Sequence, residues 1–279
     1  MTTRSESLAR AQDTLREFGG PDARLSAELL LSFVLKIDRT ALFRDRDHLL
    51  PDEERIEFER FVERRRSGEP VAYLTGEREF FSLPFFVDRS VLIPRPETER
   101  LVEIALEKLS ETPSARVVDV GTGPGTIAIA LKKQLPTLDM TGIDVSEAAL
   151  AVARRNAERN SVSIRWLQGD LLADFHEAIT VVTANLPYIP TGKIITCDPG
   201  VSNFEPRLAL DGGPDGLDLF RRLIPQARTR LIPGGSILLE IGEGQEDGVR
   251  KLLQTSGFTI ESTQSDLAGI PRVIVGRSE

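Results

Sequence analysis

Apolar residues in the first 76 positions recur every three or four residues, the interval at which side chains share one face of a helix. This spacing predicts three short amphipathic helices. Gly19-Gly20-Pro21 is expected to end the first, and the acidic run after Pro51 to begin the third. The third closes on Arg64-Arg65-Arg66, which we interpret as a solvated helix end. The apolar residues are Leu8, Ala11, Leu15 and Phe18, then Ala27, Leu30, Leu31 and Val34, then Ile56, Phe58, Phe61 and Val62.

A short aromatic region follows these helices. Segments 79–81 and 84–87 are rich in phenylalanine and flank Ser82-Leu83, which predicts two strands with a tight turn between them. Pro94-Arg95-Pro96 comes next as a rigid extended segment, because each proline restricts its own φ and the residue before it. Glu97 is then expected to begin a helix that runs through Leu106. We therefore expect a helical domain at residues 1–76, a β-hairpin linker at 77–95 and a second domain at 96–279.

From Arg116 onward, short apolar runs alternate with amphipathic stretches. This alternation is typical of a mostly parallel sheet covered by helices on both faces, an α/β fold. The last two strands have no helix between them, so we expect them to form an antiparallel pair at the sheet edge. The seven predicted strands span 117–120, 140–143, 164–167, 179–184, 236–241, 259–264 and 272–276. The predicted helices span 127–135, 148–160, 217–231 and 245–256.

Composition narrows the possible functions. The length of 279 residues is consistent with about two domains. Lys and Arg number 35 against 43 Asp and Glu, a net charge of −8, so a large nucleic-acid surface is not expected. Cys197, His48 and His176 are the only cysteine and histidines, and they suggest no disulfide, no metal site and no histidine-based catalysis. No membrane-length apolar run or signal-peptide core is present, so we expect a cytoplasmic protein.

A glycine-rich turn links the first strand of the predicted sheet to a helix. It reads Gly121-Thr122-Gly123-Pro124-Gly125, and its glycines allow a sharp turn and leave space for a ligand. A dinucleotide-binding fingerprint would need glycine or alanine at position 126, which is Thr126. Pro124 also lacks the amide hydrogen that a pyrophosphate would bind. The turn therefore disfavours a nicotinamide dinucleotide.

Acidic residues follow the next two strands at the same edge of the sheet. Asp144 ends the second strand, where a carboxylate commonly accepts hydrogen bonds from ribose hydroxyls. Asp170, with Leu171 after it, follows the third strand and is expected near an adenine. Two such acids without a pyrophosphate anchor favour a cationic nucleoside, S-adenosylmethionine. The alternative is that both aspartates only cap helices.

The segment Asn185-Leu186-Pro187-Tyr188 follows the fourth strand and so lies at the same edge. Asn/Asp-Pro-Pro-Tyr/Phe at this place is typical of methyltransferases that modify a planar nitrogen. An amide nitrogen is a poor nucleophile, and acceptors on its hydrogens concentrate charge on it as the methyl group arrives. Asn185 offers a side-chain carbonyl, Leu186 a main-chain carbonyl and Tyr188 a flat ring for stacking. The alternative is a simple proline turn after a strand.

Together these turns resemble the release factor glutamine methyltransferases, the HemK/PrmC family. The resemblance spans nearly the whole chain. It departs from the family at Leu186, where proline is usual, but the acceptor there is a main-chain oxygen and is kept. The other matching stretches are 70–76, 92–99, Glu205-Pro206, 211–218, Glu240-Ile241-Gly242 with Gln245, and 266–269 with Arg272.

The resemblance implies a small helical domain, a β-hairpin and a seven-stranded Rossmann-like class I methyltransferase domain. It implies methyl transfer from S-adenosylmethionine to the side-chain amide of the glutamine in the Gly-Gly-Gln motif of class-1 peptide release factors. The helical domain would orient the release factor, because a tripeptide is too short to provide specificity. No membrane and no direct nucleic-acid partner is expected.

The resemblance also assigns roles to residues. Segment 121–125 would line the methionine part of the cofactor, Asp144 the ribose, and Asp170 with Leu171 the adenine region. Segment 185–188 would hold the substrate glutamine as the catalytic turn, with Asn185 also beside the cofactor. The loop 94–99, which includes Thr98, is expected to border the pocket. Within it, Arg95 and Glu97 either face the pocket or form a structural ion pair.

Three other functions are weighed against this one. Ribosomal RNA adenine dimethyltransferases share the fold and a leucine in the tetrapeptide, but an acidic chain lacks the basic surface that their substrate requires. The glutamine methyltransferase of a large-subunit ribosomal protein shares the tetrapeptide but is disfavoured by the 94–99 segment and the length of the N-terminal region. A non-catalytic module would be expected to have lost part of the site, yet Gly121, Gly123, Asp144 and Asn185 are all present.

Overall fold

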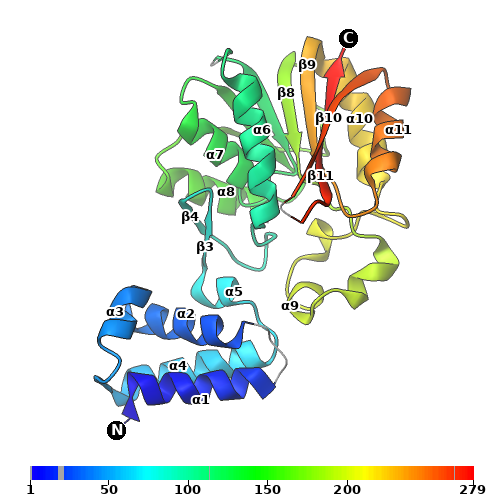
Figure 1. Cartoon of the computed structure of the whole chain (residues 1–279). Helices are drawn as coiled ribbons and strands as arrows, with labels where there is room; N and C mark the ends of the chain where they lie inside the picture. Colours follow the sequence, from blue (N-terminus) through cyan, green and yellow to red (C-terminus); the bar gives the residue numbers. More distant parts are fainter. Residues whose placement is uncertain (1, 18–21, 113, 267) are drawn as a thin grey trace. The chain divides into compact units, whose positions relative to one another are not determined.

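The computed structural model describes residues 2–17, 22–112, 114–266 and 268–279 (Figure 1). The chain divides into two compact units. The first comprises Met1–Gly76 with Asp198–Phe204, and the second comprises Glu77–Cys197 with Glu205–Glu279. A segment from the middle of the sequence therefore belongs to the helical unit, which the sequence pattern did not indicate. Within the described ranges, no helix is both long and apolar enough to cross a bilayer.

The first unit is helical. The three helices predicted from apolar spacing are confirmed as α1 (Arg4–Glu17), α2 (Ala23–Leu35) and α4 (Asp52–Arg66). Their shared core includes Leu30, Leu31 and Phe58, all at most 1% exposed. Ile56 was wrongly assigned to this core, because it faces solvent with 59% of its surface exposed. The predicted helix stop at Gly19-Gly20-Pro21 and the apolar Phe18 lie outside the described residues.

Shorter elements complete this unit. They are α3 (Arg39–Arg44), α5 (Val71–Thr75), α9 (Pro199–Ser202) and the antiparallel strands β1 (Thr2–Thr3) and β2 (Leu49–Leu50). The arginine run at the end of α4 is not simply solvated, as predicted. The Arg64 guanidinium donates to both carboxylate oxygens of Glu69 at 2.8 and 2.9 Å, and Glu69 is 4% exposed. A buried carboxylate requires a partner, so Arg64 stabilises the end of the unit as well as the helix terminus.

The β-hairpin belongs to the second unit. Its strands are β3 (Glu77–Phe80) and β4 (Leu83–Phe86), and Phe80 pairs with Leu83, so the two-residue turn is Phe81-Ser82. The predicted turn was therefore one residue too late. Both turn residues have positive φ, 51° and 58°, as a type I′ turn requires, although neither is glycine or asparagine. The Phe81 amide donates to Glu99 at 2.8 Å, which helps to hold this turn.

The core of the second unit is a seven-stranded sheet in the order β10-β11-β9-β8-β5-β6-β7. The seven predicted strands are confirmed as β5 (Arg116–Val120), β6 (Asp139–Asp144), β7 (Arg165–Gln168), β8 (Ile179–Ala184), β9 (Leu231–Glu240), β10 (Phe258–Ser265) and β11 (Pro271–Ser278). Strands β5 to β9 are parallel, and β11 is antiparallel to both its neighbours. The antiparallel pair is confirmed, but only β10 is an edge strand, because β11 inserts between β10 and β9.

Helices cover both faces of the sheet, as predicted (Figure 1). One face carries α6 (Glu99–Leu109), α7 (Thr126–Gln134) and α8 (Glu147–Arg159), and the other carries α10 (Asp218–Arg230) and α11 (Glu246–Thr255). Alternation along β5 produces this arrangement, since Val117 packs on the first face and Val118 and Val120 on the second. Helix α6 begins at Glu99 rather than Glu97, after a 3₁₀ turn, η1 (Pro96–Thr98). Two further 3₁₀ turns, η2 (Thr191–Thr196) and η3 (Arg207–Ala209), precede α10.

Candidate active site

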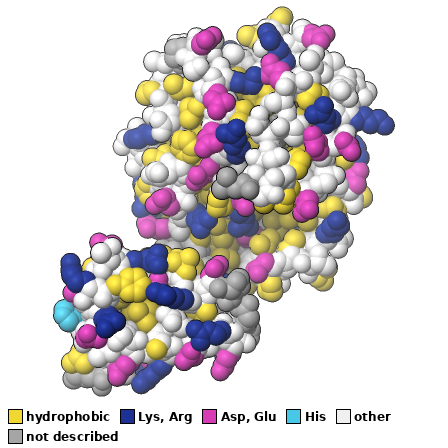
Figure 2. All heavy atoms as spheres, in the orientation of Figure 1, with side chains coloured by type: hydrophobic (Ala, Val, Ile, Leu, Met, Phe, Trp, Pro, Cys, Tyr) yellow, Lys and Arg dark blue, Asp and Glu magenta, His cyan; other side chains and the backbone are white. Residues whose placement is uncertain are grey.

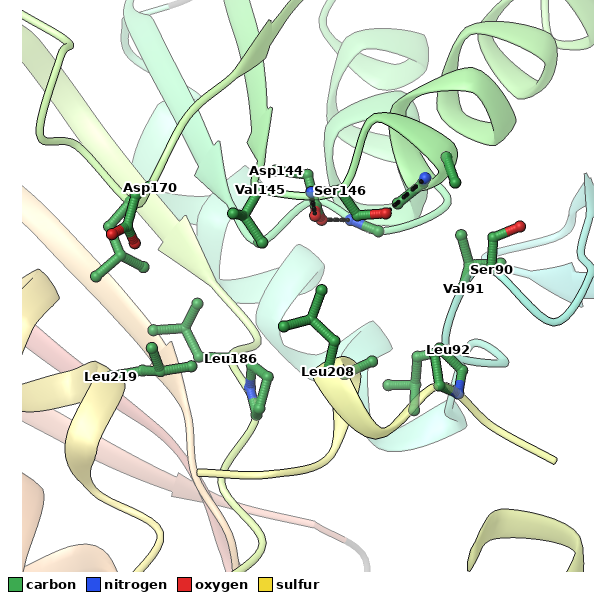
Figure 3. Close-up of a pocket in the computed structure, with 18 of the residues that line it drawn as sticks. Ser90, Val91, Leu92, Asp144, Val145, Ser146, Asp170, Leu186, Leu208 and Leu219 are labelled. Atoms are coloured by element: carbon green, nitrogen blue, oxygen red, sulfur yellow. Dashed lines mark hydrogen bonds between the residues drawn. The ribbon is translucent and has the colours of Figure 1, made fainter. Parts of the chain in front are cut away.

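The carboxyl ends of the central strands border a pocket of about 470 Å³ (Figure 3). It lies at the sheet edge where the sequence predicts a ligand. Segment 90–92, after the hairpin, and Leu208 of η3 contribute further walls. Of the predicted site residues, those that line this pocket are Gly121, Gly123, Asp144, Asp170, Leu171, Leu186 and Pro187.

The glycine turn has the conformation that its composition predicts. Gly121, Gly123 and Gly125 have φ values of 70°, 55° and 84°, which favour glycine. A Cβ atom on Gly121 would lie 2.9 Å from the Leu186 side chain, so the catalytic turn packs directly on this glycine. At Gly123 a Cβ would meet no atom within 4 Å, so this glycine leaves the pocket open.

The other residues of the turn hold it in place. The Thr122 hydroxyl donates to Asp119 at 2.6 Å, and the Pro124 carbonyl accepts from the Asn156 amide at 2.9 Å. A Cβ on Gly125 would lie 2.9 Å from Trp166, so this position packs inside the domain. Thr122, Pro124 and Gly125 thus contact the interior, while Gly121 and Gly123 face the pocket.

Asp119 is a buried acid beneath the turn, and we did not assign it a role from the sequence. Its carboxylate is fully buried and accepts hydrogen bonds from the hydroxyls of Thr122, at 2.6 Å, and Thr183, at 2.8 Å. Burial raises the pKa of Asp119 to about 7, against the opposing effect of these two donors. The available signal was an acid inside the apolar run of β5, which needs partners wherever it is buried.

Asp144 connects the glycine turn to the next helix. One carboxylate oxygen accepts from the Gly123 amide at 2.8 Å and the other from the Ser146 amide at 2.9 Å. Helix α8 is capped by Ser146, whose side chain accepts from Ala149 at 3.2 Å, so Asp144 is not the helix cap. Partial burial raises the pKa of Asp144. Each carboxylate oxygen can accept a further hydrogen bond from a ligand in the pocket.

Asp170 and Leu171 lie on the wall after β7. The Asp170 carboxylate is exposed and forms an ion pair with Arg222 of α10, a partner that the sequence did not suggest. Leu171 is 8% exposed and has a φ of 57°, which is uncommon for a residue with a side chain. This conformation lies at the pocket, where backbone strain is often functional.

The Asn185–Tyr188 turn connects the pocket to its supporting loop. The Asn185 side-chain nitrogen donates to the Thr98 hydroxyl at 3.0 Å. Its side-chain oxygen accepts no hydrogen bond from the described part of the chain, so it remains available to a ligand. Leu186 is 2% exposed, and it lines the pocket together with Pro187.

The loop before α6 has one partner that differs from the expected one. Arg95 forms an ion pair with Glu205, not with Glu97. Glu205 is 6% exposed and also accepts a hydrogen bond from the Ile93 amide at 3.2 Å. The buried carboxylate attracts the guanidinium, whereas Glu97 is exposed. This pair connects the 94–99 loop to Glu205-Pro206, two stretches whose relation the sequence left open.

A glycine-rich stretch supports the catalytic turn from below. A Cβ on Gly212 would lie 2.7 Å from the Pro187 carbonyl, and one on Gly216 would lie 2.2 Å from the Tyr188 carbonyl. Gln245 donates to the same Tyr188 carbonyl at 2.8 Å and accepts from the Gly242 amide at 2.9 Å. The stretch 211–218 therefore lets the backbone approach the turn closely, which gives it a structural purpose.

Tyr188 borders a second pocket, of about 290 Å³, together with Lys193, Asp215 and Gln245. Burial and the nearby Glu240 charge raise the pKa of Tyr188, which keeps it a neutral phenol. Glu240, at the end of β9, is 1% exposed and was not predicted to be part of the site. Its position at the carboxyl end of an apolar strand was the available signal.

Charges of both signs are interspersed over the second unit on the face that Figure 2 shows. Most of the ion pairs are local, such as Arg221 with Asp215 and Asp218, so cations and anions neutralise one another in small groups. This distribution agrees with the net charge of −8 and differs from the basic face that RNA-binding surfaces present.

Two family models match the chain. The PrmC N-terminal domain matches residues 6–76, and the methyltransferase small domain matches residues 99–196. Among solved structures, a methyltransferase from Pyrococcus furiosus has a TM-score of 0.54 and 17% identity over 71% of this chain and 90% of its own. The ribosomal protein L11 methylase from Lactobacillus delbrueckii subsp. bulgaricus has a TM-score of 0.50 and 21% identity over 66% of this chain and 81% of its own. These similarities show the methyltransferase fold.

Curated relatives are much closer. The release factor glutamine methyltransferase of Geobacter sulfurreducens is 42% identical over 264 residues, covering 94% of this chain and 92% of its own. That of Moorella thermoacetica is 41% identical over 276 residues, covering 98% of this chain and 97% of its own. Such identity along both units leaves no room for a different family. The chain belongs to the release factor glutamine methyltransferases.

Proposed function

We propose that this chain methylates the side-chain amide nitrogen of the glutamine in the Gly-Gly-Gln motif of class-1 peptide release factors, with S-adenosylmethionine as the methyl donor. The observation that carries the proposal is the Asn185 amide, whose nitrogen is bound to Thr98 and whose oxygen is left for a ligand. This oxygen stands at the edge of the pocket that Leu186 and Pro187 line. The closest functional support is the family to which the chain belongs.

The residues of the larger pocket fit S-adenosylmethionine. Gly121 and Gly123 expose backbone without side chains, and Asp144 keeps acceptor capacity for ribose hydroxyls. Leu171 and Val145 add apolar surface suited to a flat base. When bound, the cofactor supplies an electrophilic methyl group attached to a sulfonium. Asp170 remains a proposed adenine-side contact, although in this structure its carboxylate pairs with Arg222.

The catalytic turn would act on the substrate amide through acceptors and stacking. An amide nitrogen carries two hydrogens, and the Asn185 side-chain oxygen and the Leu186 main-chain oxygen can each accept one. Both acceptors keep the nitrogen in one orientation and favour the positive charge that develops on it during methyl transfer. The Tyr188 ring would pack against the planar amide group. The proton leaves the nitrogen after transfer, so no strong base is required beforehand.

A direct test is mass spectrometry of a purified class-1 release factor after incubation with this protein and S-adenosylmethionine. We expect one added methyl group on the glutamine of the Gly-Gly-Gln peptide. An unmodified release factor, together with methylation of a large-subunit ribosomal protein, would establish the other glutamine methyltransferase activity instead. Methylation of ribosomal RNA alone would contradict both.

We also propose that the helical unit orients the release factor, and that the protein acts in the cytoplasm, where translation terminates. The PrmC N-terminal domain match covers this unit and supports the first point. Deletion of residues 1–67 should reduce activity on the whole release factor more than on a short Gly-Gly-Gln peptide. Equal losses on the two substrates would show that the unit contributes only stability.

A further inference from the structure

Glu240 is a buried carboxylate that the proposed methyl transfer does not use. It is 1% exposed and lies at the carboxyl end of β9, next to the strand that leads into the catalytic turn. One of its oxygens, Oε1, accepts a long hydrogen bond of 3.4 Å from the Tyr188 hydroxyl. The other, Oε2, has no hydrogen-bond partner within the described residues. A buried carboxylate oxygen without a partner is costly to maintain, so its presence requires an explanation.

Thr98 connects this carboxylate to the catalytic turn. The Thr98 hydroxyl is 3% exposed and accepts a hydrogen bond from the Asn185 side-chain nitrogen at 3.0 Å. The same hydroxyl favours the ionised form of Glu240, as a donor close to a carboxylate does. Thr98 thus stands between Asn185 and Glu240, and rotation of its hydroxyl hydrogen is enough to reach the free Oε2 atom.

The polarity of this chain of groups decides which end of the Asn185 amide faces the substrate. An ionised carboxylate only accepts hydrogen bonds, so Thr98 must donate its single hydrogen to Glu240. The Thr98 oxygen can then only accept, which selects the nitrogen of Asn185 as its partner. The Asn185 oxygen is thereby left to accept from the substrate amide. The reversed amide would direct donors at the substrate nitrogen and oppose methyl transfer.

We propose that Glu240 and Thr98 are positioning residues that hold the Asn185 side chain with its oxygen toward the substrate amide. The proposal deepens the proposed function and rests on it, because it concerns the same catalytic turn. Neither residue needs to touch the substrate. Their effect should therefore appear in the rate of methyl transfer and leave the affinity for S-adenosylmethionine largely unchanged.

Protonation of Glu240 would remove this control. Burial raises the pKa of Glu240 to about 7, and the nearby Glu97 charge acts in the same direction. Arg272, Thr98 and Tyr188 oppose that shift. A neutral Glu240 can donate to the Thr98 oxygen, which allows Thr98 to donate to Asn185 and the amide to reverse. The rate constant kcat should therefore fall as pH decreases through about 7.

The test compares wild-type protein with Thr98→Val, Thr98→Ser and Glu240→Gln, using a purified release factor and saturating S-adenosylmethionine. Valine keeps the shape of threonine and removes the hydroxyl, so kcat should fall about 10-fold to 100-fold, as expected for a misoriented reacting group. Serine restores the hydroxyl and should restore most of kcat. Glu240→Gln cannot ionise, so its kcat should lose the pH dependence near 7. Thr229→Val and Glu107→Gln, on exposed helix faces, serve as matched controls.

Cofactor binding measured by calorimetry separates the possible outcomes. Full kcat in Thr98→Val, or a Glu240→Gln pH profile identical to that of wild type, would overturn the positioning role. If Thr98→Val fails to bind S-adenosylmethionine, the wild-type and Glu240→Gln pH profiles decide the matter alone. If Glu240→Gln also fails, a wild-type kcat that is constant from pH 6 to 8 refutes the proposal. Wild-type protein that modifies no release factor would instead refute the proposed function.

Discussion

The two halves of the site are built in different ways. On the cofactor side, Asp144 is held by two backbone amides, one of them only two residues away. On the substrate side, Asn185 is held by a hydroxyl 87 residues away, and Tyr188 by a glutamine 57 residues away. A glycine turn carries most of its geometry in its own backbone. The catalytic turn depends instead on side chains from several distant segments, so its function is more exposed to remote substitutions.

The comparison predicts its largest effect at Asn185. Asn185→Ala removes the acceptor for the substrate amide, so kcat should fall about 100-fold to 1,000-fold, by analogy with loss of one preorganised polar group. The affinity for S-adenosylmethionine should change little, because Gly121, Gly123 and Asp144 remain. Single-turnover methylation and calorimetry measure the two effects. Unchanged turnover would contradict the assigned mechanism.

Glycine substitutions on the two sides should differ in cost. Gly216 has a φ of 79°, and an added Cβ would lie 2.2 Å from the Tyr188 carbonyl, so Gly216→Ala should destabilise the protein by roughly 3 kcal/mol or more. Gly123→Ala meets no neighbouring atom and should cost only the backbone strain, about 1–2 kcal/mol. Urea denaturation measures both. Equal losses would mean that the close approach beneath Tyr188 relaxes easily.

Asp144→Asn tests the cofactor side alone. The amide loses one acceptor and the charge that favours hydroxyl donors, so the dissociation constant for S-adenosylmethionine should rise about 10-fold to 100-fold. At saturating cofactor, kcat should stay within a few-fold of wild type, because the catalytic turn is intact. A large loss of kcat with unchanged affinity would show that the two halves are not separable.

Asp119 should produce the smallest effect, and only as a function of pH. Its pKa rises from an ordinary value near 4 when unfolded to about 7 when folded. Burial therefore favours the protonated form, and the stability contributed at low pH is lost as pH rises through about 7. The melting temperature of wild-type protein should fall between pH 5 and pH 8, and Asp119→Asn should reduce that decrease. An identical pH dependence in the variant would assign it to other groups, such as Glu240.

Much of the fold was predictable because its signals are local. The strand at 179–184 was placed without error, since an apolar β-branched run of that length reads as a buried strand. The hairpin turn was placed one residue late, because Phe81 adopts a positive φ that its composition gives no reason to expect. Segment 198–204 was not assigned to the helical unit, because no periodicity reports a contact between distant parts of a chain.

The candidate site divides in the same way. Gly121, Gly123 and Asp144 were identified from spacing, since strand ends of a parallel sheet converge on one edge. Arg95 was expected to face the pocket or to pair with its neighbour Glu97, yet it pairs with the buried Glu205. Desolvation of Glu205 decides that choice, and burial of this kind depends on the whole packed domain.

By itself, the sequence determined the order of helices and strands, the glycine turn, the acids at the strand ends and the catalytic tetrapeptide. These follow from side-chain periodicity and from the conformations that glycine and proline allow or restrict. Only the tertiary structure decided which groups support Asn185 and Tyr188, and that Glu240 and Asp119 are buried with raised pKa values. Hydrogen-bond partners and desolvation are properties of packed neighbours, and those neighbours come from segments far apart along the chain.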